Sequence, residues 1–421
     1  MISNNNARVI AHSAVCLVAL EKHTLSESLF PVGSSESSFA KSLTYGSLRF
    51  YHHLNEVINS RLKKPLDKKN LDIHILLILG AYQLIYTDVS THAAINETVE
   101  VAEKIKKQWA KGLVNAILRG IDRDRDEILN TAHYSHPSWL IKKIMKEYPD
   151  HFHEIFIENN KQAPMSIRVH PSINIKSYQD KLLEVDIESK TSEIAPQSLT
   201  LSKAVNVEKL PDFKNGSCYI QDTSAQLAGQ LVAPKKGELI LDACCAPGGK
   251  TTHLAELCPS AEILALDADE KRLVKVNDNI TRLKSRNVKV ILGDATKDDW
   301  WNQKLFDKIL LDAPCTGTGV IRRHPDIKLI RKPRDLSHLI KVQASIIKNL
   351  WLMLKPGGIL VYATCSILKE ENENQISDFI KLNKDAIVNE ILIPWGHGTI
   401  GKQQLPNNIF DGFYYAQLRK K

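Results

Sequence analysis

The chain has 421 residues, of which 43% are hydrophobic and 25% charged, a composition typical of a globular protein with two or three domains. Its formal net charge of +8 favours an anionic partner such as a nucleic acid, although a plain soluble enzyme can carry the same surplus. The seven cysteines are scattered and form no CxxC pair, which argues against a disulfide framework or structural zinc and predicts that no metal is bound.

A short apolar run near the start of the chain, residues 8–20, is similar to the hydrophobic part of a secretory signal. His12 and Ser13 interrupt this run, and no clear small-residue cleavage site follows it. The sequence holds no stretch of the roughly 18 apolar residues that a membrane span requires. We therefore expect a protein of the reducing cytoplasm.

Residues 1–130 have the apolar spacing of helices throughout. Leu71, Ile75 and Ile78 follow one another at intervals of three and four residues, and turn residues such as Pro65 separate the helical stretches. This pattern predicts an all-helical domain of about five helices.

Residues 131–220 have a mixed pattern. A helix is predicted over Ser138–Tyr148, and the alternating segment Met165–Val169 is typical of a short strand. The remainder is irregular. We expect a small α+β connector domain.

Residues 221–421 alternate apolar strands with amphipathic helices. This alternation favours right-handed crossovers and a doubly wound, Rossmann-like parallel sheet. The predicted strands are Glu238–Asp242, Glu262–Asp267, Val288–Leu292, Lys308–Leu311 and Gly358–Tyr362.

Three strand ends suggest a nucleoside pocket, because ligands of open parallel sheets bind beyond the carboxyl ends of the strands. The first strand runs through Asp242 into a loop in which Gly248 and Gly249 permit close approach of the backbone to a ligand, before a helix begins near residue 250. Asp267 ends the second strand at a position suited to ribose hydroxyls. Asp294, after the third, offers an acceptor for an adenine amino group.

S-adenosylmethionine (SAM) fits this loop better than a nucleotide with several phosphates. A Walker loop needs glycine where the chain has Cys244, and the dinucleotide pattern G-x-G-x-x-G is absent. Any single acid among the three could instead cap a helix, and Lys250 could orient a ligand or face solvent. The candidate SAM-binding residues are Cys244, Cys245, Ala246, Pro247, Gly248, Gly249, Lys250, Asp267, Asp294 and Asp312.

Two cysteines follow predicted buried strands. Asp312 and Cys315 come after one strand, and Cys365 comes after another about fifty residues later. A thiol and a carboxylate at strand ends suggest covalent chemistry on an electron-poor ring. The chemistry alone does not say which cysteine attacks.

The chain resembles the bacterial 16S (small-subunit) rRNA cytosine-C5 methyltransferases of the RsmB (Fmu/Sun) type. In the amino-terminal half the resemblance is to a NusB-like helical domain and is shorter. One departure is Cys245, where the family usually has alanine. The residues that carry the resemblance are Gln221–Leu227, Asp242–Thr251, Asp267, Gly293–Asp294, Asp312–Gly319, Ile321–Lys328, Leu354–Gly358, Tyr362–Ser366 and Asp411–Ala416, with Lys111–Arg119 and His136–Leu140 in the amino-terminal half.

The resemblance implies a SAM-dependent enzyme that methylates C5 of a cytosine in 16S rRNA and works as a monomer. In such an enzyme a thiolate that adds to C6 of cytosine makes C5 nucleophilic enough to accept a methyl group. A carboxyl group on ring N3, for which Asp312 is the candidate, would stabilise the charge that develops there. The resemblance assigns Cys365 as the nucleophile and Cys315 as the residue that assists product release. Against this stands an interpretation in which one thiol is only a buried structural residue. The resemblance also implies that the helical domain, residues 1–130, and the connector help to hold rRNA, although either could serve only as core or bind a protein.

The segment of residues 321–334, beside the catalytic loop, holds six lysines and arginines. Such basic density suits an RNA backbone that passes the active site, and it makes Arg322, Arg323 and Lys328 candidate RNA contacts. A solvated charged helix face is the alternative. The target base would have to leave its stack to reach a thiol in a pocket.

Two other functions remain open at this stage. A methyltransferase acting on tRNA or DNA would share the cofactor site, and a catalytically idle RNA-binding or antitermination factor could retain the fold. The combined presence of the strand-end acids and both cysteines argues against the idle factor.

Overall fold

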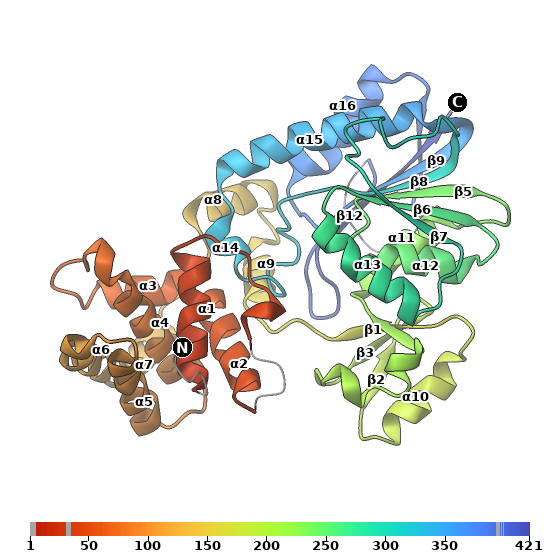
Figure 1. Ribbon diagram of the computed structural model, residues 1–421. Helices are drawn as coiled ribbons and strands as arrows, with labels where there is room; N and C mark the ends of the chain where they lie inside the picture. Colours follow the sequence, from red (N-terminus) through yellow and green to blue (C-terminus); the bar gives the residue numbers. More distant parts are fainter. Residues whose placement is uncertain (1–5, 31–34, 393–395, 397, 399) are drawn as a thin grey trace. The chain divides into compact units, whose positions relative to one another are not determined.

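The computed structural model describes residues 6–30, 35–392, 396, 398 and 400–421. The chain divides into two compact units (Figure 1). Unit 1 consists of Met1–Lys161 and Ile321–Lys332, and unit 2 consists of Gln162–Val320 and Pro333–Lys421. A short segment of the catalytic half of the sequence therefore belongs to the first unit.

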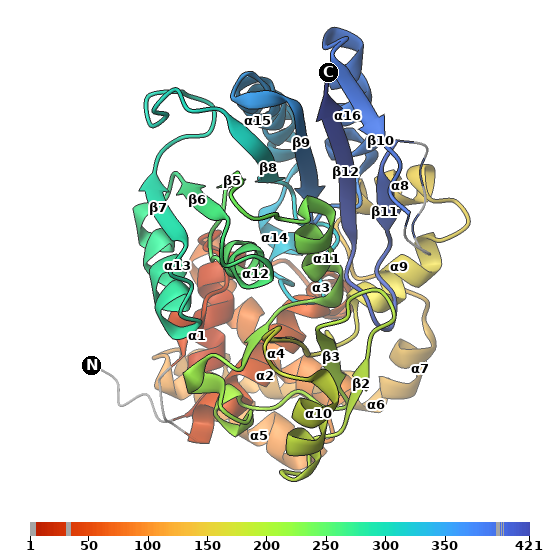
Figure 2. The ribbon, with the colours of Figure 1, turned by 90° about the vertical axis from the view of Figure 1, so that its right-hand side faces the viewer.

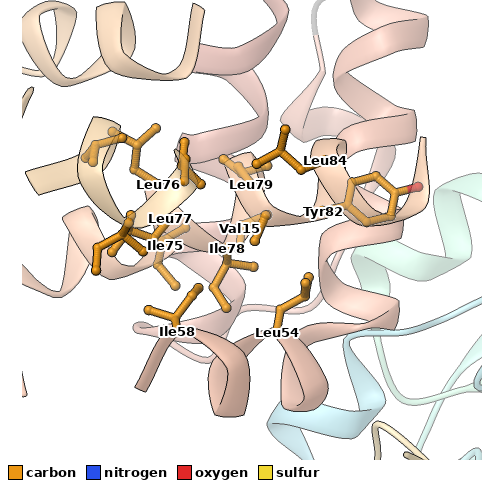
Figure 3. Close-up of a cluster of buried hydrophobic side chains, with 14 of the residues drawn as sticks. Val15, Leu54, Ile58, Ile75, Leu76, Leu77, Ile78, Leu79, Tyr82 and Leu84 are labelled. Atoms are coloured by element: carbon orange, nitrogen blue, oxygen red, sulfur yellow. The ribbon is translucent and has the colours of Figure 1, made fainter. Parts of the chain in front are cut away.

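Unit 1 is helical. Its central helix, α4, is buried over nearly its whole length, from Ile73 to Ile85, so its apolar residues occupy every face. Figure 3 shows Ile75, Leu76, Ile78 and Leu79 of this helix packed with side chains of neighbouring helices. The helices are α1 (Ala7–Ala19), α2 (Ser35–Arg49), α3 (Tyr51–Asn59), α4 (Leu71–Tyr86), α5 (Thr91–Lys104), α6 (Lys111–Arg123), α7 (Arg125–Asn130), α8 (Ser138–Glu147), α9 (Phe152–Asn159) and α14 (Ile327–Ile330).

The helical unit extends further than predicted. Its described residues up to position 130 form seven α-helices, α1–α7, where the sequence predicted about five. The helix predicted from Ser138, here α8, groups with unit 1 rather than with the connector. Hydrogen bonds explain this grouping: Ser135 donates from Oγ to the Arg49 carbonyl at 3.3 Å and accepts from the His53 amide at 3.3 Å.

The connector in unit 2 is a small antiparallel sheet in the order β2-β3-β1-β4, covered by α10 (Ile175–Leu183). Ile167 and Val169 of β1 pack with Tyr178 and Leu182 of the helix. The prediction of a small α+β domain is correct for this part. The strands are β1 (Ser166–Val169), β2 (Ser189–Thr191), β3 (Ser198–Leu201) and β4 (Cys218–Ile220).

The second part of unit 2 is an eight-stranded sheet in the order β10-β12-β9-β8-β5-β6-β7, with β11 paired to β12. Strands β5–β9 are parallel, as predicted, but β12 is antiparallel to β9, so the sheet is mixed. The strands are β5 (Leu239–Ala243), β6 (Glu262–Asp267), β7 (Val288–Leu292), β8 (Phe306–Asp312), β9 (Leu354–Thr364), β10 (Ala386–Asn389), β11 (Lys402–Gln404) and β12 (Phe413–Lys420).

Helices cover both faces of this sheet. α15 and α16 pack together on one face, and α11, α12 and α13 lie on the other (Figures 1 and 2). This is the doubly wound arrangement that the alternating sequence predicted. The helices are α11 (Thr223–Val232), α12 (Gly249–Leu257), α13 (Glu270–Arg282), α15 (Pro333–Leu352) and α16 (Glu373–Leu382).

Candidate active site

The strand register brings several loops to one edge of the large sheet. Asp242 of β5 pairs with Ala265 of β6 and with Leu310 of β8. Asp312, the last residue of β8, pairs with Ala363 of β9. Because the carboxyl ends of neighbouring parallel strands lie side by side, the loops after β5, β6, β8 and β9 border one site, where open parallel sheets bind ligands.

The loop between β5 and α12 has an unusual backbone. Cys244 and Gly248 have φ angles of 61° and 94°, and the Ala246–Pro247 peptide bond is cis. A Cβ atom on Gly248 would lie 3.2 Å from Val276, and one on Gly249 would lie 2.9 Å from a tyrosine ring. Glycine at both positions therefore lets the loop and the start of α12 pack closely against their neighbours.

Side chains from β6 and α13 hold this loop. Asp267 accepts a hydrogen bond from the Ala246 amide at 3.0 Å. Arg272 donates to the Ala246 carbonyl at 2.7 Å, and Asn279 donates to the Pro247 carbonyl at 3.0 Å. Asp267, which is only 4% exposed, thus shapes the loop as well as being a candidate ligand-binding residue.

The two cysteines of the loop are not exposed thiols. Cys245 is buried and packs with Ala265, Leu273 and Val276, as expected of a small apolar residue. Burial raises the pKa of both Cys244 and Cys245, so their thiols stay protonated at neutral pH.

Asp242 lies beneath the loop and does not reach its surface. Its side chain is fully buried and accepts a hydrogen bond from the Thr251 hydroxyl at 2.6 Å. Burial raises the pKa of Asp242 to about 7. Among the described atoms its second oxygen, Oδ1, has no hydrogen-bond partner. Asp242 therefore braces the start of α12 from inside the protein.

Asp267 and Asp294 fit the hydroxyl and amino donors of a nucleoside. Each oxygen of Asp267 accepts one backbone amide, from Ala246 and from Asp269, which leaves lone pairs for a ligand. Asp294 accepts two bonds from Thr296 through a single oxygen, and these bonds lower its pKa. Both groups are placed as acceptors at the ends of adjacent strands, and the structure thus fits SAM.

The two strand-end thiols lie together. The sulfur atoms of Cys315 and Cys365 are 3.4 Å apart. The Gly319 amide donates to the Cys365 carbonyl at 2.9 Å, and the Gly412 amide donates to the Gly319 carbonyl at 2.8 Å. A Cβ atom on Gly319 would lie 2.1 Å from the Gly412 carbonyl oxygen, so the loops after β8 and β9 and the start of β12 can meet only with glycine here.

Lys250 points into the site rather than toward solvent, which excludes the solvent-facing interpretation. Its Nζ lies 2.7 Å from Asp312 Oδ2 and 5.5 Å from the centre of the Phe413 ring. Burial acts to lower the pKa of Lys250, but the charge and hydrogen bond of Asp312 outweigh it and raise the pKa. The site therefore carries an ammonium group next to the candidate catalytic carboxylate.

Sequence reasoning missed Glu371, a buried carboxylate beneath the thiols. It accepts from the Thr316 amide at 2.8 Å, from the Thr316 hydroxyl at 2.5 Å and from the Ser366 hydroxyl at 2.5 Å. Gln343 donates to it at 3.2 Å. Thr316 and Ser366 each directly follow a site cysteine, so one carboxylate fixes both cysteine loops. Its partners lie 5, 28 and 55 residues away in sequence, so no local pattern marked it.

The surroundings of Cys315 favour its protonated form. The hydrogen bond with Cys365 raises the pKa of Cys315 well above that of a free thiol, and burial and the charge of Glu371 act in the same direction. Cys315 therefore stays protonated at neutral pH and has a proton with which it can act as a donor in the pair.

The structure corrects the prediction that the basic segment after the catalytic loop offers Arg322 and Lys328 to RNA. Arg322 and Lys328 are each 1% exposed and lie within unit 1. Lys328 donates to the Arg49 carbonyl at 2.7 Å and to Asn160 at 2.5 Å, and burial lowers its pKa well below the usual value. Neither residue presents its charge to an RNA phosphate, and the alternative of a solvated charged face is also wrong for them.

Two further contacts of this segment are also internal to unit 1. Arg322 pairs with the buried Glu158 at 3.5 Å. The Asp326 carboxylate accepts from the Leu25 amide at 3.0 Å. Arg323 is partly exposed and has interactions within the protein. The segment thus serves as an inserted piece of the helical unit.

Among the residues that the structure describes, no group of three or more histidine, cysteine, aspartate or glutamate side chains could hold a metal ion. No helix within the described ranges has the length and apolar character needed to cross a membrane.

Comparison with known families divides the chain into three parts. Residues 229–419 match the family described as 16S rRNA methyltransferase RsmB/F. Residues 5–123 match the NusB family, and residues 136–208 match the ferredoxin-like domain of RsmF/B-like methyltransferases. The three matches follow the order of the three domains proposed from the sequence.

Similar proteins cover the full chain. Those named Ribosomal RNA small subunit methyltransferase B from Salmonella enteritidis and Salmonella typhi are each 41% identical over 433 residues and match over 100% of both chains. A methyltransferase homolog from Pyrococcus horikoshii is 28% identical, with a TM-score of 0.61 over 68% of this chain and 96% of that chain. The structure of PH0851 shares the fold, with a TM-score of 0.82 at 24% identity over 98% of this chain and 99% of that one.

Proposed function

Because this chain belongs to the 16S rRNA methyltransferase RsmB/F family, we propose that it methylates C5 of a specific cytosine in 16S rRNA through a covalent bond between Cys365 and C6. Family membership makes it a SAM-dependent rRNA methyltransferase. The choice of cytosine C5 and the covalent step are supported by the chemistry of the site, above all by the 3.4 Å separation of two thiols at adjacent strand ends.

SAM supplies an electrophilic methyl group when bound. The acceptor carboxylates of Asp267 and Asp294 suit its ribose hydroxyls and adenine amino group, and the backbone of residues 244–249 lines the same edge of the sheet. Cys245 would contribute through its main chain, because its side chain packs into the core.

In the first step the Cys365 thiolate adds to C6 of the cytosine, and the electrons of the C5–C6 double bond move toward N3. The Asp312–Lys250 pair provides the proton and charge that stabilise N3. C5 would then accept the methyl group that SAM supplies, as the methyl–sulfur bond breaks. Loss of the C5 proton to a base restores the C5–C6 double bond and expels Cys365 as a thiolate, and the proton on N3 returns to the Asp312–Lys250 pair.

Cys315 acts on this departing thiolate. Because Cys315 stays protonated and its sulfur lies 3.4 Å from that of Cys365, it can donate a hydrogen bond to the negative sulfur. Stabilising the leaving thiolate speeds its release from C6. Without that donor, the covalent protein–RNA intermediate should persist.

The two other candidate functions are a cytosine methyltransferase acting on tRNA and a catalytically idle RNA-binding factor. A cytosine in tRNA would use the same chemistry, so the preference for 16S rRNA rests on family membership. An idle RNA-binding factor does not need a paired Asp312 and Lys250 beside two thiols, and we therefore disfavour it. The seven free cysteines suit the reducing cytoplasm, where rRNA is made.

The test is methyl transfer from SAM to unmodified 16S rRNA, read by bisulfite sequencing. Wild-type protein is expected to protect one cytosine, and Cys365→Ser should abolish protection. Cys315→Ala should yield a protein–RNA adduct that survives denaturation. Cys258→Ser, at the end of α12, is the matched control and should behave as wild type. Protection of tRNA alone would overturn the substrate, and an adduct with Cys365→Ser would reverse the two roles.

A further inference from the structure

Arg168 of the connector is completely buried and reaches the start of α12, directly after the loop that borders the SAM site. It lies on β1, in the middle of the small antiparallel sheet, and its side chain is 0% exposed. Both the connector and α12 belong to unit 2. A charged group with no access to water must find all its partners inside the protein.

The guanidinium of Arg168 has five N–H donors, and each has an acceptor. Nε and one Nη2 proton bind the two oxygens of Glu256, both at 3.0 Å, in a bidentate pair. Nη2 also donates to the Thr252 hydroxyl at 3.1 Å. Nη1 donates to the Gly249 carbonyl at 2.8 Å and to the side chain of Gln221.

Three of these acceptors lie on one stripe of α12. Gly249, Thr252 and Glu256 are spaced by three and four residues, so they share one face of the helix. Gly249 is its first residue and directly follows the loop of residues 244–248. Arg168 therefore fixes the rotation and position of the helix from which the loop emerges.

The connector adds a second contact at the same point. The ring of Tyr219, on β4, lies 5.1 Å from the guanidinium carbon of Arg168. A Cβ atom on Gly249 would come within 2.9 Å of that ring. Tyr219 and Arg168 thus pack against the first residue of α12 from two neighbouring connector strands, β1 and β4.

We propose that Arg168 is a positioning residue for SAM binding, and that the connector is a structural part of the cofactor site as well as a candidate RNA-holding domain. Arg168 does not touch the ligand. It acts through α12, whose first turn and preceding loop must keep their place for Asp267 to hold the Ala246 amide and for Lys250 to reach Asp312. The proposal concerns the SAM step that family membership establishes, so it stands independently of the cysteine chemistry.

The experiment measures SAM affinity of the full-length protein by titration calorimetry without RNA, together with thermal unfolding. Arg168→Lys keeps the charge but loses the bidentate pair. Thr252→Val removes, with little change in volume, the hydroxyl that accepts from Arg168 and donates to the Gly248 carbonyl at 2.9 Å. We expect Arg168→Lys to fold and to bind SAM at least about tenfold more weakly, and Thr252→Val to weaken binding about threefold. In steady-state assays the KM for SAM should rise, while kcat at saturating SAM and the KM for rRNA stay near wild type.

The control is Lys308→Met, which removes another buried ion pair of unit 2, with Glu238 at 3.0 Å. Its side chain donates to the Ala233 carbonyl at 2.6 Å and makes no contact with α12 among the bonds described. This variant should lose stability yet keep wild-type SAM affinity. Wild-type SAM affinity in the folded fraction of Arg168→Lys would overturn the proposal, as would equal weakening of SAM binding by Lys308→Met.

Discussion

The sulfur atoms of Cys315 and Cys365 lie 3.4 Å apart although the residues are 50 positions apart in sequence. The pairing of β8 with β9 sets this distance, because Asp312 lies opposite Ala363 and each cysteine follows within three residues. Two thiols so close can share one proton, which allows one to be a thiolate while the other donates to it.

The role of Cys315 can be resolved by two substitutions. Cys315→Ser keeps a hydrogen-bond donor and Cys315→Ala removes it, so release of the RNA adduct should be slow in the first and slower still in the second. Adduct lifetime, measured by denaturing gel after a SAM pulse, tests this order. Equal lifetimes in both variants would mean that Cys315 acts by proton removal or covalently, and not as a donor.

Glu371 is expected to set the relative position of the two cysteine loops. Glu371→Gln keeps the shape and can still hydrogen-bond to Thr316 and Ser366, whose hydroxyls can accept as well as donate. Glu371→Ala leaves these groups unpaired. We expect the alanine variant to lose about 100-fold in single-turnover methylation and the glutamine variant about tenfold or less, in line with the cost of unpaired buried groups.

The distance between the two cysteine loops can also be tested without RNA. Bifunctional thiol reagents that span two close sulfurs should cross-link Cys315 and Cys365 readily in wild type and in Glu371→Gln, and poorly in Glu371→Ala. Glu373→Ala, two residues along at the start of α16, is the matched control and should leave both methylation and cross-linking unchanged. Efficient cross-linking in Glu371→Ala would show that Glu371 does not position the two cysteine loops.

The sequence predicted the parallel strands because a strand buried on both faces is a continuous apolar run. It did not predict the antiparallel strand β12. The first residues of this strand, Phe413–Ala416, are buried, but the sequence around them is irregular and does not alternate strands with helices. The prediction of RNA contacts at Arg322 and Lys328 failed for a related reason. Charge suggested exposure, but their acceptors, such as the Arg49 carbonyl and Asn160, come from distant helices.

Asp242 should make the free energy of unfolding depend on pH. Its pKa of about 7 in the folded state exceeds the value near 3.9 expected when unfolded, so the folded state binds more protons between these limits. This contribution to stability is fully present below about pH 4 and is lost as pH rises through about 7. The free energy of unfolding should fall by up to about 1.4 kcal/mol per pH unit from this group.

Urea unfolding of wild type and Asp242→Asn from pH 5 to 8, without SAM, measures this contribution. Asparagine cannot ionise but still accepts a hydrogen bond from the Thr251 hydroxyl. The stability of the variant should therefore change less with pH, and at pH 8 the variant should be more stable relative to wild type than at pH 5. Thr251→Val separates the hydrogen bond from the charge. Parallel profiles for wild type and Asp242→Asn would show that the carboxyl group titrates at its ordinary value.

The buried lysine of the inserted segment gives the clearest distinction between a structural and an RNA-binding role. Lys328→Met should destabilise unit 1 by about 1–3 kcal/mol, because the Arg49 carbonyl and Asn160 lose a buried donor. Lys142→Met, at an exposed position of α8, is the matched control and should change stability by no more than about 0.5 kcal/mol. At temperatures where Lys328→Met is folded, rRNA affinity should keep the same dependence on salt. A salt slope reduced by about one, with unchanged stability, would instead mean that Lys328 neutralises a phosphate.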